Sequence, residues 1–283
     1  MSTDAIVPRV WLALSIAAAL LTAVSSAAGI WMPEVYARET ISWAAQGIGQ
    51  DIVNLFVVAP AIVVCVYLAE RGSVRAWLVC LGLLLYITYS FVLYSFFVHF
   101  NRLFLVYVSV LGLSFWALVG AVSSADTDRV ARALDLERGH ATAAAMYLMV
   151  SGLLFGLLWL SDIVPAIASG STPRGLADVG LPVNPVHVLD LAFALPATIA
   201  TAWLLWRRRP GGLLFAVPLL TFTATMGVAI VGMSVVMNVR GLAAGNGVVA
   251  VFVVLVAIAL DLTYLLLRKP LDVSIDARLR SAL

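Results

Sequence analysis

The chain has 283 residues, of which 63% are hydrophobic and 11% are charged, and its mean hydropathy is +1.06. Because a water-soluble domain carries about 25% charged residues, these side chains could not cover a globular surface, and lipid must surround the protein. The formal net charge of +2 provides no basic face for a nucleic-acid partner. The two cysteines, Cys65 and Cys80, form no CxxC pair, which argues against a disulfide scaffold or a zinc knuckle.

Eight apolar stretches follow one another along the chain, near residues 10–30, 50–69, 76–100, 103–124, 142–168, 187–206, 212–238 and 247–267. A helix of about 20 residues crosses the roughly 30 Å of hydrocarbon in a bilayer. Since backbone polar groups in lipid must be paired within their own segment, we expect each stretch to be a helix and not a strand. The sequence therefore predicts an all-α, polytopic membrane bundle with eight transmembrane helices.

The first stretch also has the features of a cleavable signal peptide. Arg9 precedes an apolar run that ends in the small residues of positions 23–27, a pattern typical of such peptides. An internal repeat, described below, favours a retained helix instead, because it pairs the first helix with the fifth. Both interpretations stay open from the sequence.

The basic residues are distributed unevenly between alternate loops. With the N-terminus placed in the cytoplasm, 13 of the 17 Lys and Arg residues fall inside, and four fall outside: Arg38, Arg102, Arg174 and Arg240. Cytoplasmic loops of membrane proteins carry such an excess of positive charge. We therefore predict a multi-pass protein of the cell membrane with its N- and C-termini in the cytoplasm.

Three connecting loops are long enough to carry structure of their own. Residues 31–49 contain Tyr36 and Trp43, aromatic side chains suited to the membrane interface, and predict a short interfacial helix. The loop 125–141 alternates in charge and predicts a solvated cytoplasmic helix. Residues 169–186 are rich in Gly, Ser and Pro and predict an irregular connection.

The second and sixth stretches resemble each other when the sequence is shifted by 136 residues. The shift aligns polar, proline and arginine positions: Asp51 with His187, Asn54 with Asp190, Pro60 with Pro196, and Arg71 with Arg207. An even number of helices in each unit restores the same starting side, so the two units would be parallel and related by a pseudo-twofold axis along the membrane normal. The sequence thus predicts a duplicated four-helix unit, residues 1–141 and residues 142–283.

Four polar residues begin the second and sixth stretches at the predicted outer surface: Asp51, Asn54, His187 and Asp190. Residues at i and i+3 share a helix face, so each pair can point towards one site between the units. Imidazole and carboxylate groups bind zinc or another divalent metal, and they also act as general acids and bases. We therefore predict Asp51, His187 and Asp190 as catalytic residues and metal ligands, with Asn54 contacting a ligand. The alternative is that all four only complete the starts of their helices.

The third stretch combines aromatic and polar residues. Tyr86, Tyr94 and Asn101 fall on one side of a continuous helix, and we predict that they contact a ligand. His99 falls on the opposite side, where it is either a further metal ligand or an isolated interfacial histidine. Haem bound between His99 and His187 is another alternative.

These residues together predict a site that opens to the extracytoplasmic side and binds a metal ion or a small, lipid-like or periplasmic ligand. One interpretation is a hydrolase or transferase in which Asp190 and His187 activate water. A second is a transporter of ions or small molecules, since carboxylates within a membrane also bind cations during transport. A third is a non-catalytic assembly partner of another membrane protein. Whether the protein is an enzyme stays open.

Overall fold

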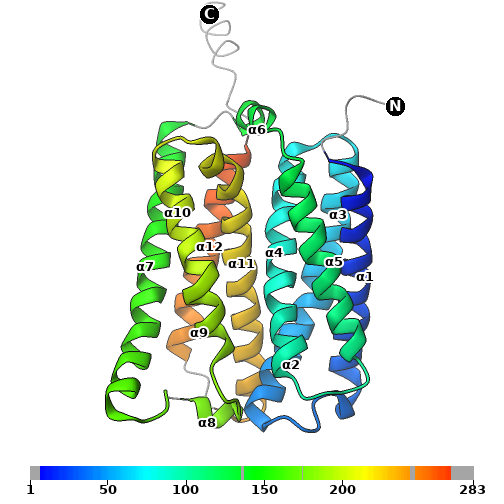
Figure 1. Ribbon diagram of the computed structural model, residues 1–283, viewed down its shortest axis with the longest axis vertical. Helices are drawn as coiled ribbons and strands as arrows, with labels where there is room; N and C mark the ends of the chain where they lie inside the picture. The colour runs from blue at the N-terminus through cyan, green and yellow to red at the C-terminus, as the bar shows by residue number, and fades with distance from the viewer. Residues whose placement is uncertain (1–6, 135–136, 174, 243–245, 269–283) are drawn as a thin grey trace, which may run out of the picture.

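The computed structural model describes residues 7–134, 137–173, 175–242 and 246–268. Within these residues the protein is all-α, and eight helical segments are long and apolar enough to cross a membrane. The long helices run side by side along the longest axis of the bundle (Figure 1). The prediction of an all-α bundle with eight helices able to span a membrane is confirmed.

Six of the eight segments are single helices: α1 (Arg9–Trp31), α4 (Val74–Phe97), α5 (Phe104–Ser123), α7 (Arg138–Ser169), α11 (Pro210–Val239) and α12 (Asn246–Leu267). The second segment consists of α2 (Ile41–Val53), η2 (Asn54–Val58) and α3 (Ala59–Glu70). The sixth consists of α9 (Pro185–Leu189), η3 (Asp190–Ala194) and α10 (Leu195–Trp206). Three short elements lie in the loops: η1 (Pro33–Val35), α6 (Thr127–Leu134) and α8 (Leu176–Val179).

The second and sixth segments are each interrupted by one stretch of π-helix, η2 and η3. In each stretch the first carbonyl, that of Asn54 or Asp190, accepts a hydrogen bond from the amide five residues later. A proline, Pro60 or Pro196, comes directly after that donor. Proline lacks an N–H and its ring clashes with the carbonyl of the preceding turn, so a wider turn relieves the crowding. The two π-helices lie 136 residues apart, the shift found in the sequence.

The same two segments also end alike. Arg71, just after α3, stacks its guanidinium over the ring of Tyr67 at 4.2 Å. Arg207, just after α10, stacks over Trp203 at 4.8 Å. The shared features therefore extend from the polar start of each segment, through its π-helix, to its basic end.

The bundle has two sides, one built from α1 to α5 and the other from α7 to α12 (Figure 1). They meet where α11 packs against α2 and α4. A Cβ atom on Gly49 of α2 would collide with the backbone of Met233, and one on Gly82 of α4 would collide with Pro218. Small residues allow helices to approach this closely, so these glycines hold the two sides together.

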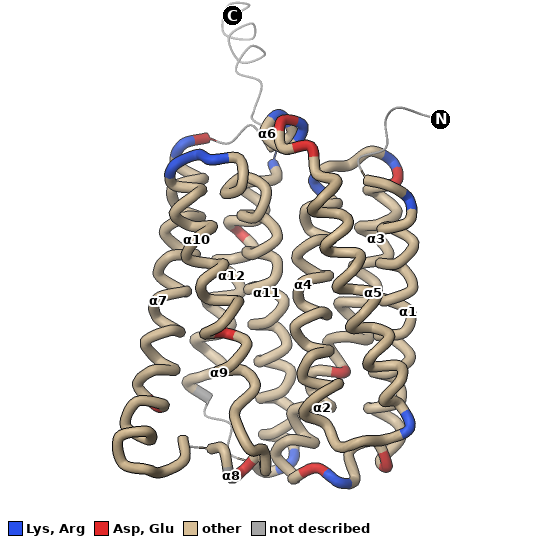
Figure 2. The backbone as a smooth tube through the Cα atoms, viewed as in Figure 1, with Lys and Arg blue, Asp and Glu red and all other residues tan. Residues whose placement is uncertain are grey.

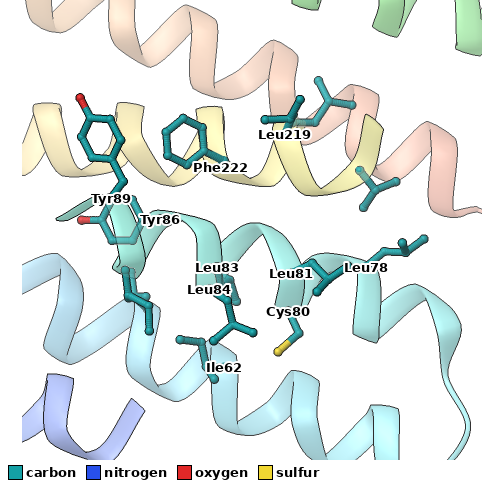
Figure 3. Packing of buried hydrophobic residues seen from close by; sticks show 14 of the residues in the cluster. Ile62, Leu78, Cys80, Leu81, Leu83, Leu84, Tyr86, Tyr89, Leu219 and Phe222 are labelled. Atoms are coloured by element: carbon teal, nitrogen blue, oxygen red, sulfur yellow. The ribbon is translucent and has the colours of Figure 1, made fainter. Parts of the chain in front are cut away.

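Helix α4 is buried over most of its length and forms the centre of the apolar core. Figure 3 shows Ile62 of α3 packed against one side of α4 and Phe222 of α11 against the other. Tyr86 and Tyr89 leave this helix in different directions, and the ring of Tyr89 lies 5.7 Å from that of Phe222. By contrast α12 is the least buried of the spanning helices.

Two boundaries differ from the sequence prediction. The second segment begins at Ile41 and not near residue 50, because Thr40 caps the helix by accepting a hydrogen bond from the amide of Trp43 at 3.2 Å. Residues 31–49 therefore contain one short separate helix, η1, and the start of α2, and the interfacial position of this segment stays a prediction. The third segment ends at Phe97, so His99 and Asn101 follow the helix. The helix predicted in 125–141 is confirmed as α6.

Charged residues gather at the two ends of the bundle, and a few acidic positions lie between them (Figure 2). The start of α1, the end of α12 and α6 share one end, and α8 lies at the other (Figure 1). Four of the basic residues counted for the topology lie outside the described residues: Arg174, Lys269, Arg278 and Arg280.

Candidate functional site

A cavity of about 300 Å³ lies between the two sides of the bundle. Residues of α2, α4, α7, η3, α10, α11 and α12 line it. The wall is mainly apolar and aromatic, with Phe155, Phe222 and Phe252 among its residues. Ligand pockets of proteins are commonly concave, mostly apolar and about 300–1,000 Å³ in size. The cavity is therefore large enough for a small organic molecule or part of a lipid.

Asp190 is the acidic side chain in this wall. The hydroxyl of Tyr89 donates to its Oδ1 atom at 3.0 Å, and the indole N–H of Trp159 donates to its Oδ2 atom at 2.8 Å. The three residues come from η3, α4 and α7, so helices from both sides of the bundle fix the carboxylate. A carboxylate has about four acceptor positions, and these two hydrogen bonds use two of them.

His187 is buried, with 7% of its surface exposed, and its ring lies 4.7 Å from that of Trp159. The start of its helix is capped: the side chain of Asn184 accepts a hydrogen bond from the amide of Val186 at 3.0 Å, and Pro185 is the first helical residue. His187 is electrostatically coupled to Asp190. Within the described chain, however, Asp190 lines the cavity and His187 does not.

Asp51 lies in a different cluster, inside the first side of the bundle. Only 1% of its surface is exposed. The hydroxyl of Tyr36 donates to its Oδ2 atom at 2.5 Å, and that of Tyr94 donates to Oδ1 at 2.9 Å. Its carboxylate packs so closely on α1 that a Cβ atom on Gly29 would collide with it. The charges acting on His187 are those of Asp162 and Asp190, so the structure divides the four predicted residues into two pairs.

Tyr36, which precedes α2, is held in its protonated form. Burial, and after it the neighbouring Asp51 carboxylate, raise the pKa of Tyr36 well above its ordinary value. The phenol therefore keeps its proton and stays a hydrogen-bond donor to Asp51.

Two other predicted ligand-contacting residues, Asn54 and Tyr86, are completely buried. Neither the amide of Asn54 nor the hydroxyl of Tyr86 has a hydrogen-bond partner among the described residues. Tyr86 is four residues before Ser90 and eight before Tyr94, so the three share one face of α4, and for Tyr86 and Tyr94 this is the predicted arrangement. This face borders the buried group formed by Asp51, Asn54, Tyr36 and Tyr94, the Asp51 cluster, because both Tyr86 and Tyr94 interact with Asp51.

Asn101 and His99 hold loops together. The side-chain amide of Asn101 donates to the Val35 carbonyl at 3.3 Å and accepts from the Leu103 amide at 2.9 Å. Glu39 accepts a bond from the backbone amide of His99 at 2.7 Å and pairs with its Nδ1 atom at 3.0 Å. Because α4 ends before both residues, neither continues the face formed by Tyr86 and Tyr94, in contrast to the prediction for Asn101.

The described residues contain no group of three or more His, Cys, Asp or Glu side chains that could hold a metal ion. The predicted zinc site made of Asp51, His99, His187 and Asp190 therefore receives no support. The surroundings of His99 and His187 also differ, since Glu39 holds the first and Trp159 contacts the second. This gives no support to haem bound between them.

Three residues that hold the carboxylates were not recognised in the sequence: Tyr36, Tyr89 and Trp159. One signal was available for Trp159, because an indole N–H inside a membrane needs an acceptor. The hydroxyl of Tyr89 within α4 carried the same signal. The sequence provides no comparable signal for Tyr36, which lies in the loop before α2.

Comparison with known protein families, with curated proteins and with solved structures gives no match to this chain. The geometry of the two clusters and of the cavity is therefore the basis for the functional proposal.

Proposed function

We propose that this multi-pass membrane protein binds an amphiphilic molecule with a cationic, N–H-rich head group in the cavity between its two sides. The observation that carries the proposal is the Asp190 carboxylate, which lines an apolar, aromatic cavity and, among the described residues, accepts hydrogen bonds from the neutral donors Tyr89 and Trp159. A cationic head group would pair with this carboxylate, while its hydrocarbon part would contact the apolar wall.

The charge around Asp190 supports a cationic ligand. Among the described residues, no Lys or Arg lines the cavity. His187 is the basic residue that acts on Asp190, and a histidine charge is not permanent near neutral pH. Burying a carboxylate without a positive partner is unfavourable, so an ammonium group would be stabilised here. The rings of Phe155, Phe222 and Trp159 add favourable faces for a cation.

Binding is supported better than catalysis. A hydrolase built from Asp51, His187 and Asp190 would require all three at one substrate, and of these only Asp190 lines the cavity. Transport is the second candidate function, because transporter sites commonly form between two structural units of a bundle, and this cavity lies between the two sides.

A duplication would account for the arrangement of the two sides. The matching π-helices, the following prolines and the arginine–aromatic stacks all support a repeat of 136 residues, with units 1–141 and 142–283. Equivalent units in parallel orientation would place the cavity next to their pseudo-twofold axis.

The cavity would face the extracytoplasmic side of the cell membrane. Tyr36, Trp43 and Val98 extend its wall towards the end of the bundle that carries α8. The basic turns after α3 and α10 lie at the opposite end, with α6 (Figures 1 and 2). Since cytoplasmic loops are the basic ones, we propose that α6 and both termini are cytoplasmic.

A labelling experiment tests this orientation. In a Cys65→Ala/Cys80→Ala background, a membrane-impermeant maleimide should label Thr172→Cys on intact cells and should label Asp128→Cys only after the membrane is opened. Both positions are exposed. The reverse pattern would overturn the proposed orientation.

Native mass spectrometry tests the binding proposal with a defined probe. The purified protein in non-ionic detergent should form a saturable adduct with decylammonium, whose head group donates N–H bonds, and none with decyl sulfate, which has the same chain length and the opposite charge. Hydrogen bonds to charged groups contribute about 1.5–3 kcal/mol, so Asp190→Asn should weaken binding by roughly 10- to 100-fold.

The matched control is Asp261→Asn on α12, because Asp261 is also acidic and within a spanning helix but does not line the cavity. This variant should bind the probe like the wild type. Equal affinity of the wild type and Asp190→Asn, or equal binding of the cationic and anionic probes, would contradict the proposal.

A further inference from the structure

The Asp51 cluster is a second group of buried polar side chains; Asp51 itself does not line the cavity, although Tyr36 and Tyr94, which donate hydrogen bonds to it, do. Its members come from three parts of the first side: Asp51 and Asn54 from the second spanning segment, Tyr36 from the loop before it, and Tyr94 from α4. Asp51 is 1% exposed and Asn54 is 0% exposed. A carboxylate this deeply buried requires a compensating charge or a dense set of donors.

The groups that face Asp51 are all neutral. Ser26 of α1 and Tyr36 interact with it, as do Tyr86 of α4 and Tyr107 of α5. Helix α11, which packs along α2, contains no charged residue between Pro210 and Val239. Arg38, in the loop before α2, is exposed and donates to the Phe100 carbonyl at 3.4 Å, and it does not act on Asp51. Glu39 of the same loop and Asp178 of α8 are acidic. Among the described residues the carboxylate therefore has no cationic partner.

Oxygen atoms with unused lone pairs surround this carboxylate. Asn54 makes no hydrogen bond with described residues, and the hydroxyls of Ser26, Tyr86 and Ser90 make none of good geometry, although Ser26 lies near Asp51 and Ser90 lies near Tyr86. Asn54 follows Asp51 by three residues and Ser90 follows Tyr86 by four, so each pair shares a helix face. Asn54 also opens the π-helix η2, and π-helical turns are frequent at functional sites.

We propose that Asp51, Asn54 and the neighbouring hydroxyls bind a single sodium ion. Hard cations prefer oxygen ligands from carboxylate, amide carbonyl and hydroxyl groups. One carboxylate balances one positive charge, whereas a divalent ion would leave a net positive charge in an apolar interior. A proton on Asp51 would neutralise the carboxylate but would leave the buried amide oxygen of Asn54 without a partner among the described residues.

Equilibrium binding of radioactive sodium to the purified protein in lipid nanodiscs tests this site. We expect saturable, near-stoichiometric binding that unlabelled sodium displaces and choline does not. Asp51→Asn should abolish the saturable binding, because it removes the negative charge while keeping the shape of the side chain. Asp261→Asn, which removes a carboxylate elsewhere in the spanning region, should retain it.

Two measurements keep the test decisive if Asp51→Asn does not fold. The wild-type Tm should be higher in sodium chloride than in choline chloride at equal ionic strength, and Asn54→Ala or Ser90→Ala should reduce this difference. If unlabelled sodium displaces no more radioactive sodium from the wild type than choline does, or if the Tm is the same in both salts, the sodium proposal is wrong. Water or a proton then occupies the cluster. Neither outcome depends on the ligand proposed for the Asp190 cavity.

Discussion

The two sides of the bundle differ in how closely their first and last spanning helices pack against each other. In the first side α1 packs closely along α5, and a Cβ atom on Gly120 would collide with the indole of Trp11. In the second side the corresponding helices in chain order, α7 and α12, make fewer contacts and border the cavity through Phe155 and Phe252, whose rings stack at 5.8 Å. The first pair is packed closely beside the polar cluster around Asp51, whereas the second pair is separated and borders the cavity.

The position of the carboxylate relative to the π-helix also differs between the two sides. In the first side it is Asp51, in the last turn of α2 before the π-helix, and Asn54 begins the π-helix. In the second side the order is reversed: His187 comes first, and Asp190 begins the π-helix. A shift of three residues is nearly one helical turn. Consistent with this difference, Asp51 is enclosed against α1, whereas Asp190 lines the cavity.

Replacing Gly29 by Ala should have the largest effect, because the new methyl group would collide with the Asp51 carboxylate. Forcing a buried charge away from its hydrogen-bond donors costs about 3–5 kcal/mol. We expect a loss of this size in the free energy of unfolding, measured by SDS titration in mixed micelles.

The matched control in the second side is Gly156→Ala on α7, where the added Cβ would have only an ordinary contact, 3.9 Å from Leu195. This variant should be neutral or slightly more stable, since Ala favours helix over Gly. Similar losses for Gly29→Ala and Gly156→Ala would mean that the first side is no more tightly closed than the second.

Gly120→Ala should have an intermediate effect, because it pushes Trp11 away and separates α1 from α5. Overpacking of a tight contact costs about 1–3 kcal/mol, and thermal unfolding should show a lower Tm. Gly112→Ala on the same helix is the control, since nothing lies within 4 Å of its Cβ position. A neutral Gly120→Ala would show that the α1–α5 contact adjusts without loss.

The helices of this fold could be predicted from sequence for a simple physical reason. Each spanning segment must be apolar over a fixed length and must pair its own backbone, so both properties are local. The boundaries were less accurate where local signals compete. Thr40 starts α2 before the most apolar residues begin, and Val98 and Phe100 continue the apolar pattern beyond the end of α4.

The candidate sites were predictable only in part. The spacing of Asp51 with Asn54, and of His187 with Asp190, identified the two polar helix faces. Which donors reach each carboxylate depends on how distant helices pack, and the hydrogen bond from Tyr89 to Asp190 joins residues 101 positions apart. Such contacts have no local signature, so the sequence could not separate one shared site from two clusters.

Two tyrosines on α4 provide the smallest and most selective comparison. The Tyr89 hydroxyl donates to the Asp190 carboxylate at 3.0 Å, whereas the Tyr86 hydroxyl has no partner among the described residues. A hydrogen bond to a charged group is worth about 1.5–3 kcal/mol, and the Asp190 cluster is partly open to the cavity, so Tyr89→Phe should cost about 1.5 kcal/mol of unfolding free energy. In choline chloride Tyr86→Phe should cost less than about 0.5 kcal/mol, because no bond is lost.

Repeating the Tyr86→Phe measurement in sodium chloride connects this comparison to the proposed ion. If the Tyr86 hydroxyl helps to bind sodium, the variant should lose stability relative to the wild type in sodium but not in choline. Tyr89→Phe should lose the same amount in both salts, since Tyr89 contacts Asp190 and not the Asp51 cluster. A Tyr86→Phe loss that is equal in the two salts would instead mean that this hydroxyl is stabilised by water, and Tyr86 would be removed from the ion site.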